Sequence, residues 1–142
     1  MNILEKISAY GHENILCTHS TTIELTKENS VSKKGNCILG IKATKSCIDL
    51  NPILKKNIIN EKKIKVSIRA EKLTDSFYGF GNKYLTLLDN KDLVFRKSSY
   101  ICDRTVLINC SKSSNDLIRK LIKKLKNPTI KFSVIFEVND DN

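Results

Sequence analysis

The sequence lacks several features that would place the protein in a defined class. No stretch approaches the roughly 20 apolar residues that a membrane-spanning helix requires, and the start lacks the apolar core and cleavage site of a secretory signal. The five cysteines are odd in number and never occur as Cys-x-x-Cys, so neither a disulfide framework nor a zinc ribbon is indicated. These absences predict a reduced, cytoplasmic protein without a membrane span.

Two common signatures of phosphate binding and catalysis are also missing. Neither the phosphate-loop pattern Gly-x-x-x-x-Gly-Lys nor the nucleophile pattern Gly-x-Ser-x-Gly occurs. No linker rich in proline, glycine or serine divides the 142 residues, and this length suits one domain with its own core. We therefore predict a single domain over residues 1–142, with a frayed polar tail at 139–142.

Arginine is scarce among the basic residues. Lysine outnumbers arginine by 21 to 4, whereas dedicated phosphate sites favour the planar guanidinium of arginine. The net charge of +10 therefore has two explanations. It belongs either to a solvated, lysine-rich surface or to a surface that binds nucleic acid or a phosphate-bearing small molecule.

Two segments recur in the second half of the chain. Thr-Lys-Ser-Cys-Ile-Asp-Leu at 44–50 reappears as Ser-Lys-Ser-Ser-Asn-Asp-Leu at 111–117. Ile-Lys-Val-Ser-Ile-Arg-Ala-Glu at 64–71 reappears as Ile-Lys-Phe-Ser-Val-Ile-Phe-Glu at 130–137. The separations are nearly equal, 67 and 66 positions. Matches in the same order at one spacing predict an internal repeat.

Each predicted repeat, about 5–72 and 73–138, has the same order of hydrophobic patterns, with the seam at 74–81. Strict alternation at 64–71 and its counterpart is typical of a strand with one buried face. The order in each repeat is strand, strand, strand, helix, strand. The predicted fold is α+β and mainly antiparallel β, a sandwich or a strongly curled sheet. Two helices flank it, and a pseudo-twofold axis relates the repeats.

Both predicted helices have an apolar stripe and a start signal. Pro52 fits an early helical turn, and Ser46 and Ser113 each precede an aspartate by three positions, as in a capping box. The second helix is predicted over 113–126, with lysines opposite its stripe. The stripes comprise Leu50, Ile53, Leu54 and Ile58 in the first repeat, and Leu117, Ile118, Leu121, Ile122 and Leu125 in the second.

Six short motifs carry a further signal. They are Gly11-His12-x-Asn14, Thr18-His19-Ser20-Thr21-Thr22-Ile23-Glu24, Lys34-Gly35-Asn36-Cys37-Ile38-Leu39-Gly40, Val94-Phe95-Arg96-Lys97-Ser98, Asp103-Arg104-Thr105, and Lys112 with Asp116-Leu117. In this order they resemble an archaeal family known only as domain-of-unknown-function family 371. The resemblance implies a small archaeal protein with a mainly β, internally repeated fold, and it implies no activity, cofactor or catalytic residue. One departure is Asn36, where the family pattern more often has aspartate.

The histidines His12 and His19 and the thiol of Cys37 occur in the first repeat without counterparts in the second. Histidine suits proton transfer near neutral pH, and imidazole with thiolate suits zinc. These three residues are therefore candidate catalytic residues. Their spacing matches no established zinc pattern, so no metal ligands are assigned. The simpler interpretation is two histidines satisfied by hydrogen bonds at the rim of a sheet.

A second candidate site is an anion-binding site. Arginines, hydroxyls and free backbone N–H groups of loops together hold phosphate or carboxylate groups, and lysines just before a helix add to the field of its N-terminus. An ion pair between Asp103 and Arg104, or between an aspartate and a lysine, is the simpler alternative. The candidate anion-binding residues are Arg96, Lys97, Ser98, Arg104, Thr105, Lys45 and Lys112.

Two functions of different classes follow. The first is a non-enzymatic module that binds an anionic partner, either a phosphate-bearing ligand or nucleic acid. The lysine face of the 113–126 helix is a further candidate surface, although no aromatic side chain is interleaved there for base stacking. The second is a small enzyme with a histidine-based acid–base or metal site in the first repeat. The sequence leaves the cofactor and the oligomeric state open.

Overall fold

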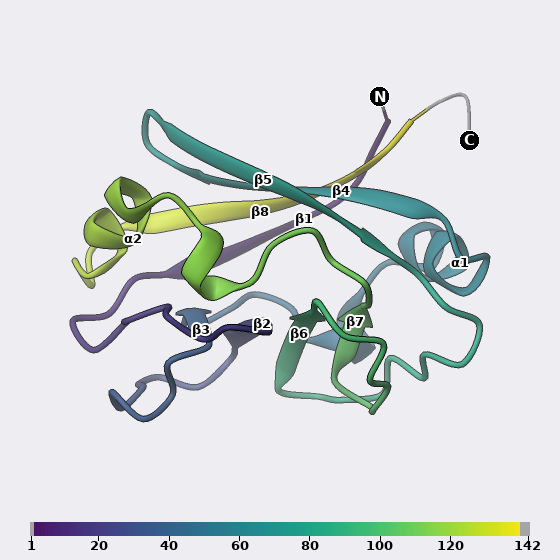
Figure 1. Cartoon of the computed structure of the whole chain (residues 1–142), viewed down its shortest axis with the longest axis horizontal. Helices are drawn as coiled ribbons and strands as arrows, with labels where there is room; N and C mark the ends of the chain where they lie inside the picture. The colour runs from purple at the N-terminus through teal and green to yellow at the C-terminus, as the bar shows by residue number, and fades with distance from the viewer. Residues whose placement is uncertain (1, 140–142) are drawn as a thin grey trace.

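The chain folds into two four-stranded β-sheets that lie in separate layers (Figure 1). The computed structural model describes residues 2–139. Sheet A has the strand order β1-β8-β4-β5, and sheet B has the order β3-β2-β6-β7. The strands of sheet A are β1 (Asn2–Tyr10), β4 (Lys63–Ala70), β5 (Leu73–Phe80) and β8 (Lys131–Val138). Those of sheet B are β2 (Thr22–Thr26), β3 (Ile38–Gly40), β6 (Asp92–Arg96) and β7 (Thr105–Leu107).

Antiparallel pairing dominates the fold. All neighbouring strands of sheet A are antiparallel, and so is the central pair β2–β6 of sheet B. Only the short edge strands depart from this rule, because β3 and β7 pair in parallel with β2 and β6. The predicted α+β class with mainly antiparallel strands is confirmed.

The hydrophobic core joins the two sheets. The ring of Phe95 in β6 lies 5.3 Å from the ring of Phe77 in β5 and 5.8 Å from that of Phe136 in β8, measured between centroids. Ile23 and Leu25 of β2 are fully buried in the same cluster. Since alternate side chains of a strand point to opposite faces, these residues define the inner face of sheet B.

Two short helices, α1 (Pro52–Ile59) and α2 (Arg119–Leu125), lie near opposite ends of the layers (Figure 1). Each follows a single 3-10 turn, η1 (Cys47–Asp49) or η2 (Ser114–Asp116). The capping boxes of Ser46 and Ser113 are present, but they cap the 3-10 turns. The cap of α1 is Asn51, whose side chain accepts the Leu54 N–H at 2.8 Å.

The helix predicted over 113–126 is wrong in its first half. Ile118 has non-helical backbone angles (φ −57°, ψ 122°), and its N–H donates to the buried carboxylate of Asp75 at 2.8 Å, which holds the chain outside the helix. Ile118 is 48% exposed and Ile53 is 65% exposed, so neither belongs to the buried stripe. The predicted seam between the repeats at 74–81 lies almost entirely in strand β5, which pairs along its length with β4.

Gly11 and Gly81 lie 70 positions apart and pass the ends of α2 and α1. A Cβ atom would lie 2.2 Å from the carbonyl oxygen of Leu125 at Gly11, and 2.0 Å from that of Ile58 at Gly81. No side chain fits at such a distance, so glycine is required at both positions. Contacts that recur at this spacing support the internal repeat, which stays a prediction.

Three further predictions concern membrane-spanning helices, the cysteines and the C-terminal tail. Within residues 2–139 no helix is long and apolar enough to cross a membrane. All five cysteines are free thiols, three of them buried. Residues 140–142 of the predicted polar tail lie outside the described part of the chain.

Candidate functional site on the outer face of sheet B

Two carboxylates lie on the face of sheet B that points away from the core. Because Ile23 and Phe95 point inward, Glu24 of β2 points outward, and so does Asp92 at the start of β6. Glu24 lies opposite Val94, which places it diagonally across from Asp92. Both carboxylates are nevertheless covered, since the side chains of Glu24 and Asp92 are only 9% and 5% exposed to solvent.

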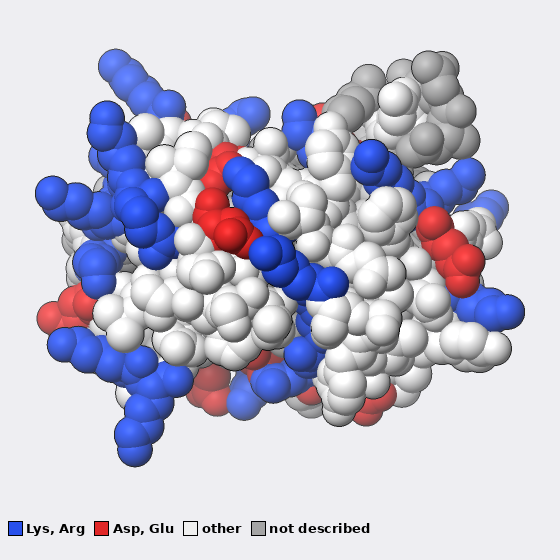
Figure 2. All heavy atoms as spheres, in the orientation of Figure 1, with Lys and Arg blue, Asp and Glu red and all other residues white. Residues whose placement is uncertain are grey.

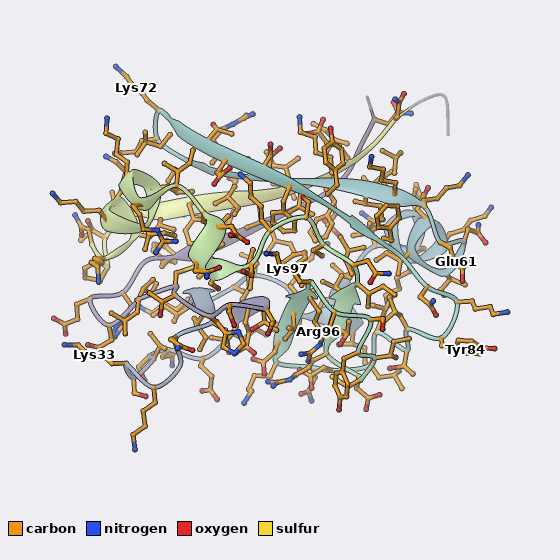
Figure 3. All side chains as sticks on the ribbon, viewed as in Figure 1. Lys33, Glu61, Lys72, Tyr84, Arg96 and Lys97 are labelled. Atoms are coloured by element: carbon orange, nitrogen blue, oxygen red, sulfur yellow. The ribbon has the colours of Figure 1, made fainter. Side chains whose placement is uncertain are left out.

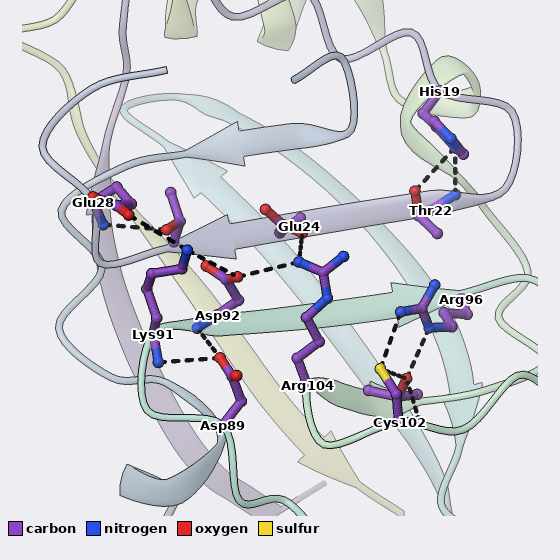
Figure 4. A network of polar contacts seen from close by, with 12 residues as sticks. His19, Thr22, Glu24, Glu28, Asp89, Lys91, Asp92, Arg96, Cys102 and Arg104 are labelled. Carbon is purple, nitrogen blue, oxygen red and sulfur yellow. Dashed lines mark hydrogen bonds and ion pairs between the residues drawn. The ribbon is translucent and has the colours of Figure 1, made fainter. Parts of the chain in front are cut away.

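Arg104 covers both carboxylates with one guanidinium group (Figure 4). Its Nη1 atom donates to Glu24 Oε1 and to Asp92 Oδ2, at 3.2 Å each. The Arg104 side chain is 46% exposed, so it lies between the two buried carboxylates and solvent. The neighbouring Asp103 is not its partner in these ion pairs and instead accepts a hydrogen bond from Thr86.

The two carboxylates are electrostatically unequal. Burial raises the pKa of Glu24 to about 7, and the negative charge of Asp92 adds to this effect, while Arg104 opposes it. One oxygen of Asp92, Oδ1, is buried and accepts no hydrogen bond from any described residue. Buried polar atoms without a partner are uncommon in folded proteins. A carboxyl group with a pKa near neutrality is suited to proton exchange at physiological pH.

Arg96 lies beside this cluster at the end of β6. Its Nε donates to Thr105 Oγ1 at 2.7 Å, its Nη2 contacts Cys102 Sγ at 3.4 Å, and its guanidinium carbon lies 4.9 Å from the Tyr100 ring centroid. Burial alone would raise the pKa of the Cys102 thiol. Hydrogen bonds from Thr105, from the backbone of Arg104 and from Arg96 outweigh burial, so this pKa lies below its usual value.

His19 lies just before β2, and hydrogen bonds hold its ring. Its Nδ1 atom accepts the N–H groups of Thr21 and Thr22 at 3.2 Å and lies 2.9 Å from Thr22 Oγ1. The side chain of Thr22 also contacts the thiol of Cys37, whose pKa is raised by burial. Thr22 therefore joins two of the three predicted catalytic residues.

His12, the third predicted catalytic residue, is not part of this group. Its N–H donates to the carbonyl of Leu125 at the end of α2, at 2.9 Å, and its Nδ1 accepts the Asn14 N–H at 3.0 Å. Within residues 2–139, no hydrogen bond joins His12 to His19 or Cys37. No group of three His, Cys, Asp or Glu side chains in this range is placed to hold a metal ion.

The two lysines before the helices each pair with a buried carboxylate. Lys45 Nζ lies 3.0 Å from Glu5 Oε2, and Lys112 Nζ lies 2.6 Å from Asp75 Oδ1. The side chains of Glu5 and Asp75 are 7% and 4% exposed. Both ammonium charges are therefore compensated by the protein, which disfavours an added anion at these positions.

Lys97 and Ser98 follow Arg96 in the sequence, and Lys97 lies near the middle of the view in Figure 3. Lys97 Nζ pairs with Asp116 Oδ2 of η2 at 2.8 Å, and Ser98 Oγ accepts the Tyr100 N–H at 3.3 Å. These contacts attach the end of β6 to its surroundings. Of the seven predicted anion-binding residues, the structure thus brings Arg96, Arg104 and Thr105 to the outer face of sheet B, whereas anion binding itself stays a prediction.

Sequence reasoning missed three residues of this site: Glu24, Asp92 and Cys102. One signal was available for the first two. Both strands of the central pair have a charged residue within a short apolar run, Thr-Ile-Glu-Leu-Thr and Asp-Leu-Val-Phe-Arg. A carboxylate between strand residues of this kind is buried only with a partner, but the sequence does not show that Arg104 is that partner.

A basic groove lies away from this site, where the turn between β4 and β5 meets α2. The groove is open and has a volume of about 620 Å³. Figure 2 shows Lys and Arg side chains gathered at this end of the molecule, and Figure 3 places Lys72 at the tip of the turn. Glu71 pairs with Lys124 at 2.6 Å. The lining residues are Glu71, Lys72, Leu73, Lys120, Lys123 and Lys124.

The sequence is similar to a known family and to a protein of an archaeon. The sequence profile of a family described as Domain of unknown function (DUF371) matches residues 7–139. A protein of Methanocaldococcus jannaschii, described as Uncharacterized protein MJ0206, is 47% identical over 120 residues. This alignment covers 84% of the chain and 89% of the relative. Neither description names an activity or a ligand.

Proposed function

The chain belongs to the DUF371 family, and we propose that it binds a small anionic ligand, a carboxylate or a phosphate, on the outer face of sheet B. Four of the six motifs that resemble the family contribute side chains to this face. They supply His19 and Glu24, Cys37, Arg96 and Arg104. Segments distant in the sequence thus converge on one surface.

The observation that carries this proposal is the arrangement of the two guanidinium groups. Arg104 uses Nη1 for Glu24 and Asp92, and Arg96 uses Nε and Nη2 for Thr105 and Cys102. Within the described residues, Nε and Nη2 of Arg104 and Nη1 of Arg96 have no hydrogen-bond partner. Since these atoms only donate, they suit an acceptor ligand such as a carboxylate or a phosphate.

The contacts that hold the two arginines also lower the cost of binding. A guanidinium group that is fixed by the protein loses less side-chain entropy when it binds a ligand. The hydrogen bonds to Glu24, Asp92 and Thr105 supply this fixation. They also reduce the net positive charge of the face, so we expect modest affinity and a preference for ligands that reach both arginines.

Calorimetry with a panel of anions tests the proposal. Inorganic phosphate, sulfate, succinate, citrate and a nucleoside triphosphate are titrated into the protein at low ionic strength. We expect at least one of them to bind and its dissociation constant to increase about tenfold or more in Arg96→Ala and in Arg104→Ala.

Arg69→Ala is the matched control, because Arg69 is an exposed arginine on β4 of the other sheet. It removes the same charge without touching the face and should leave the dissociation constant within about twofold. The proposal is contradicted if none of the anions binds, or if all three variants bind alike.

A second candidate function is nucleic-acid binding, which the basic groove between α2 and the β4–β5 turn favours. Four lysines surround it against one glutamate, and Glu71 neutralises only Lys124. Ammonium groups gathered in this way bind phosphodiester backbones without reading sequence, because the phosphates are the same at every nucleotide. The residues that line the groove include no aromatic side chain for base stacking.

Fluorescence anisotropy with labelled single-stranded RNA and duplex DNA tests this candidate. The double variant Lys120→Gln/Lys123→Gln should weaken binding and lower the slope of log K against log salt by about one to two. The control Lys33→Gln/Lys34→Gln removes the same charge from an exposed loop. If both double variants lose the same affinity, binding depends on the net charge of the protein and not on the groove.

A further inference from the structure

The two buried carboxylates on the outer face of sheet B carry more negative charge than Arg104, the arginine that covers them, can balance. Glu24 and Asp92 are both buried, and Arg104 contacts both through the same Nη1 atom. Among the described residues, the only other cation paired with Asp92 is Lys91, whose exposed ammonium group lies 4.0 Å from Asp92 Oδ2 and is shared with Glu28 at 3.4 Å. Two ionised carboxylates would therefore be compensated by one guanidinium and by a distant, solvated ammonium, which is costly in a region of low dielectric constant.

The hydrogen bonds of Asp92 show where the missing positive charge belongs. Oδ2 of Asp92 accepts from Arg104, while Oδ1 is buried without a partner among the described residues. Since Oδ1 only accepts, a donor is required to satisfy it. The carboxyl group of Glu24 on the same face is a candidate donor, because Glu24 Oε1 and Asp92 Oδ2 both lie 3.2 Å from Arg104 Nη1.

We propose that Glu24 and Asp92 share one proton, held by Glu24 and donated to Asp92 Oδ1, and that an anion bound at Arg96 and Arg104 increases the affinity of the pair for this proton. The proton balances the buried charge and supplies the donor that Asp92 lacks. Two carboxyl groups this close to one atom titrate as a pair and not as independent groups.

The groups around the pair favour this assignment. Arg104 and Lys91 stabilise the ionised form, and Arg96 contributes in the same direction from β6. Burial and, after it, the negative charge of Asp92 oppose these cations and dominate, so the pKa of Glu24 is raised to about 7. Just before the neighbouring strand β3, Cys37 is a thiol whose own pKa is raised by burial. It therefore contributes no charge near neutral pH.

The second half of this inference rests on the proposed function. An anion near Arg104 adds negative charge beside Glu24 and so favours the protonated form. Linkage then requires that anion binding takes up protons near pH 7 and tightens as the pH falls. The ligand class is a small anion whose own charge is constant in this range, or one whose protonation is known.

Carbon-13 NMR of side-chain carboxyl groups tests the shared proton without any ligand. We expect the Glu24 resonance to titrate near neutral pH, well above an ordinary glutamate. The midpoint should move to lower pH in Asp92→Asn, because the like charge that raises it is removed. Glu28→Gln is the control, since Glu28 pairs with Lys91 nearby but is itself exposed. A Glu24 midpoint near pH 4 overturns the inference.

Calorimetry with sulfate tests the coupling to binding, because the charge of sulfate stays constant near neutral pH. Titrations in buffers of different ionisation enthalpy should show uptake of a fraction of a proton per sulfate near pH 7. The dissociation constant should fall as the pH is lowered, by at most about tenfold per pH unit. Glu24→Gln should abolish both effects.

The two measurements separate the two ideas. If Glu24 titrates near neutrality but no anion binds, the shared proton stands and the proposed function fails. If sulfate binds without proton uptake and Glu24 titrates near pH 4, the proposed function stands and the shared proton is wrong.

Discussion

Lys45 donates to both carboxylate oxygens of Glu5, at 3.1 and 3.0 Å, although the two residues are 40 positions apart. Glu5 Oε2 also accepts the Asn51 N–H at 2.9 Å. The buried carboxylate thereby attaches strand β1 to the segment before α1. Lys112 and Asp75 make the corresponding pair before α2, and Asp75 in turn accepts the Ile118 N–H.

We predict that Lys45→Met destabilises the protein by about 2–4 kcal/mol, because it leaves the carboxylate of Glu5 buried without its cation. Chemical denaturation at pH 7 measures the free energy of unfolding. Lys33→Met is the control: Lys33 is exposed in a loop, so the change should be within about 0.5 kcal/mol. Adding Glu5→Gln to Lys45→Met should recover part of the loss. An additive double variant would contradict the pairing.

Glu24 should make stability depend on pH in the direction opposite to that of an ordinary carboxylate. The folded state raises the pKa of this group from 4.5 to about 7. The folded state therefore binds a proton that the unfolded state has lost. The contribution of Glu24 to the free energy of unfolding is fully present below about pH 4.5 and is lost as the pH rises through about 7.

The size of this effect is set by the shift of about two to three pKa units, which corresponds to about 3 kcal/mol. The measurement is the free energy of unfolding of wild type and Glu24→Gln between about pH 4 and 8. The difference between the two proteins isolates Glu24 from the two histidines. A difference that does not change with pH would show that folding leaves the pKa of Glu24 unshifted.

Gly81→Ala should destabilise the protein by about 2–4 kcal/mol, since the new Cβ would lie 2.0 Å from the carbonyl oxygen of Ile58 and backbone must move. Gly11→Ala meets the carbonyl of Leu125 at 2.2 Å and should have a similar effect. Gly35→Ala is the control, because its nearest contacts at 3.1 Å are the ends of the flexible side chains of Ile38 and Val31. Thermal unfolding ranks the three. If all three variants lose the same stability, the close contacts of Gly81 and Gly11 with backbone carbonyl groups are contradicted.

The fold could be predicted from the sequence where one face of an element is buried and the other solvated. β4 and β8 have this alternation, and their predicted bounds agree with the structure to within one or two residues. The family resemblance is also confirmed. The start of α2 could not be predicted in this way. The buried carboxylate of Asp75 holds Ile118 outside the helix, and this contact spans 43 positions.

The site was predictable only in part, for a related reason. Arg96, Arg104 and Thr105 were found because basic and hydroxyl side chains followed apolar strands. Glu24 and Asp92 were missed because Arg104 covers them and so makes their strands continuously buried. The contact between Arg104 and Glu24 spans 80 positions of the sequence. His12 was grouped with His19 from proximity in sequence, yet the turn that begins at Gly11 directs it to the end of α2.

The last prediction concerns the reactivity of the five cysteines. Cys102 is partly exposed, and its hydrogen bonds from Thr105 and Arg96 hold its pKa below the usual value. Burial raises the pKa of Cys17 to about 11 and that of Cys47 and Cys110 to about 12. Because the thiolate is the reactive form, Cys102 should be alkylated first in the folded protein at pH 7.5.

Brief treatment with iodoacetamide followed by peptide mass spectrometry measures this order. We expect Cys102 to react at least about tenfold faster than the three buried thiols. Arg96→Ala should slow its alkylation severalfold, since the guanidinium no longer stabilises the thiolate, whereas Arg69→Ala should leave the rate unchanged. If Cys102 reacts no faster than Cys37, which is also partly exposed but has a raised pKa, then exposure and not Arg96 controls the reactivity of these thiols.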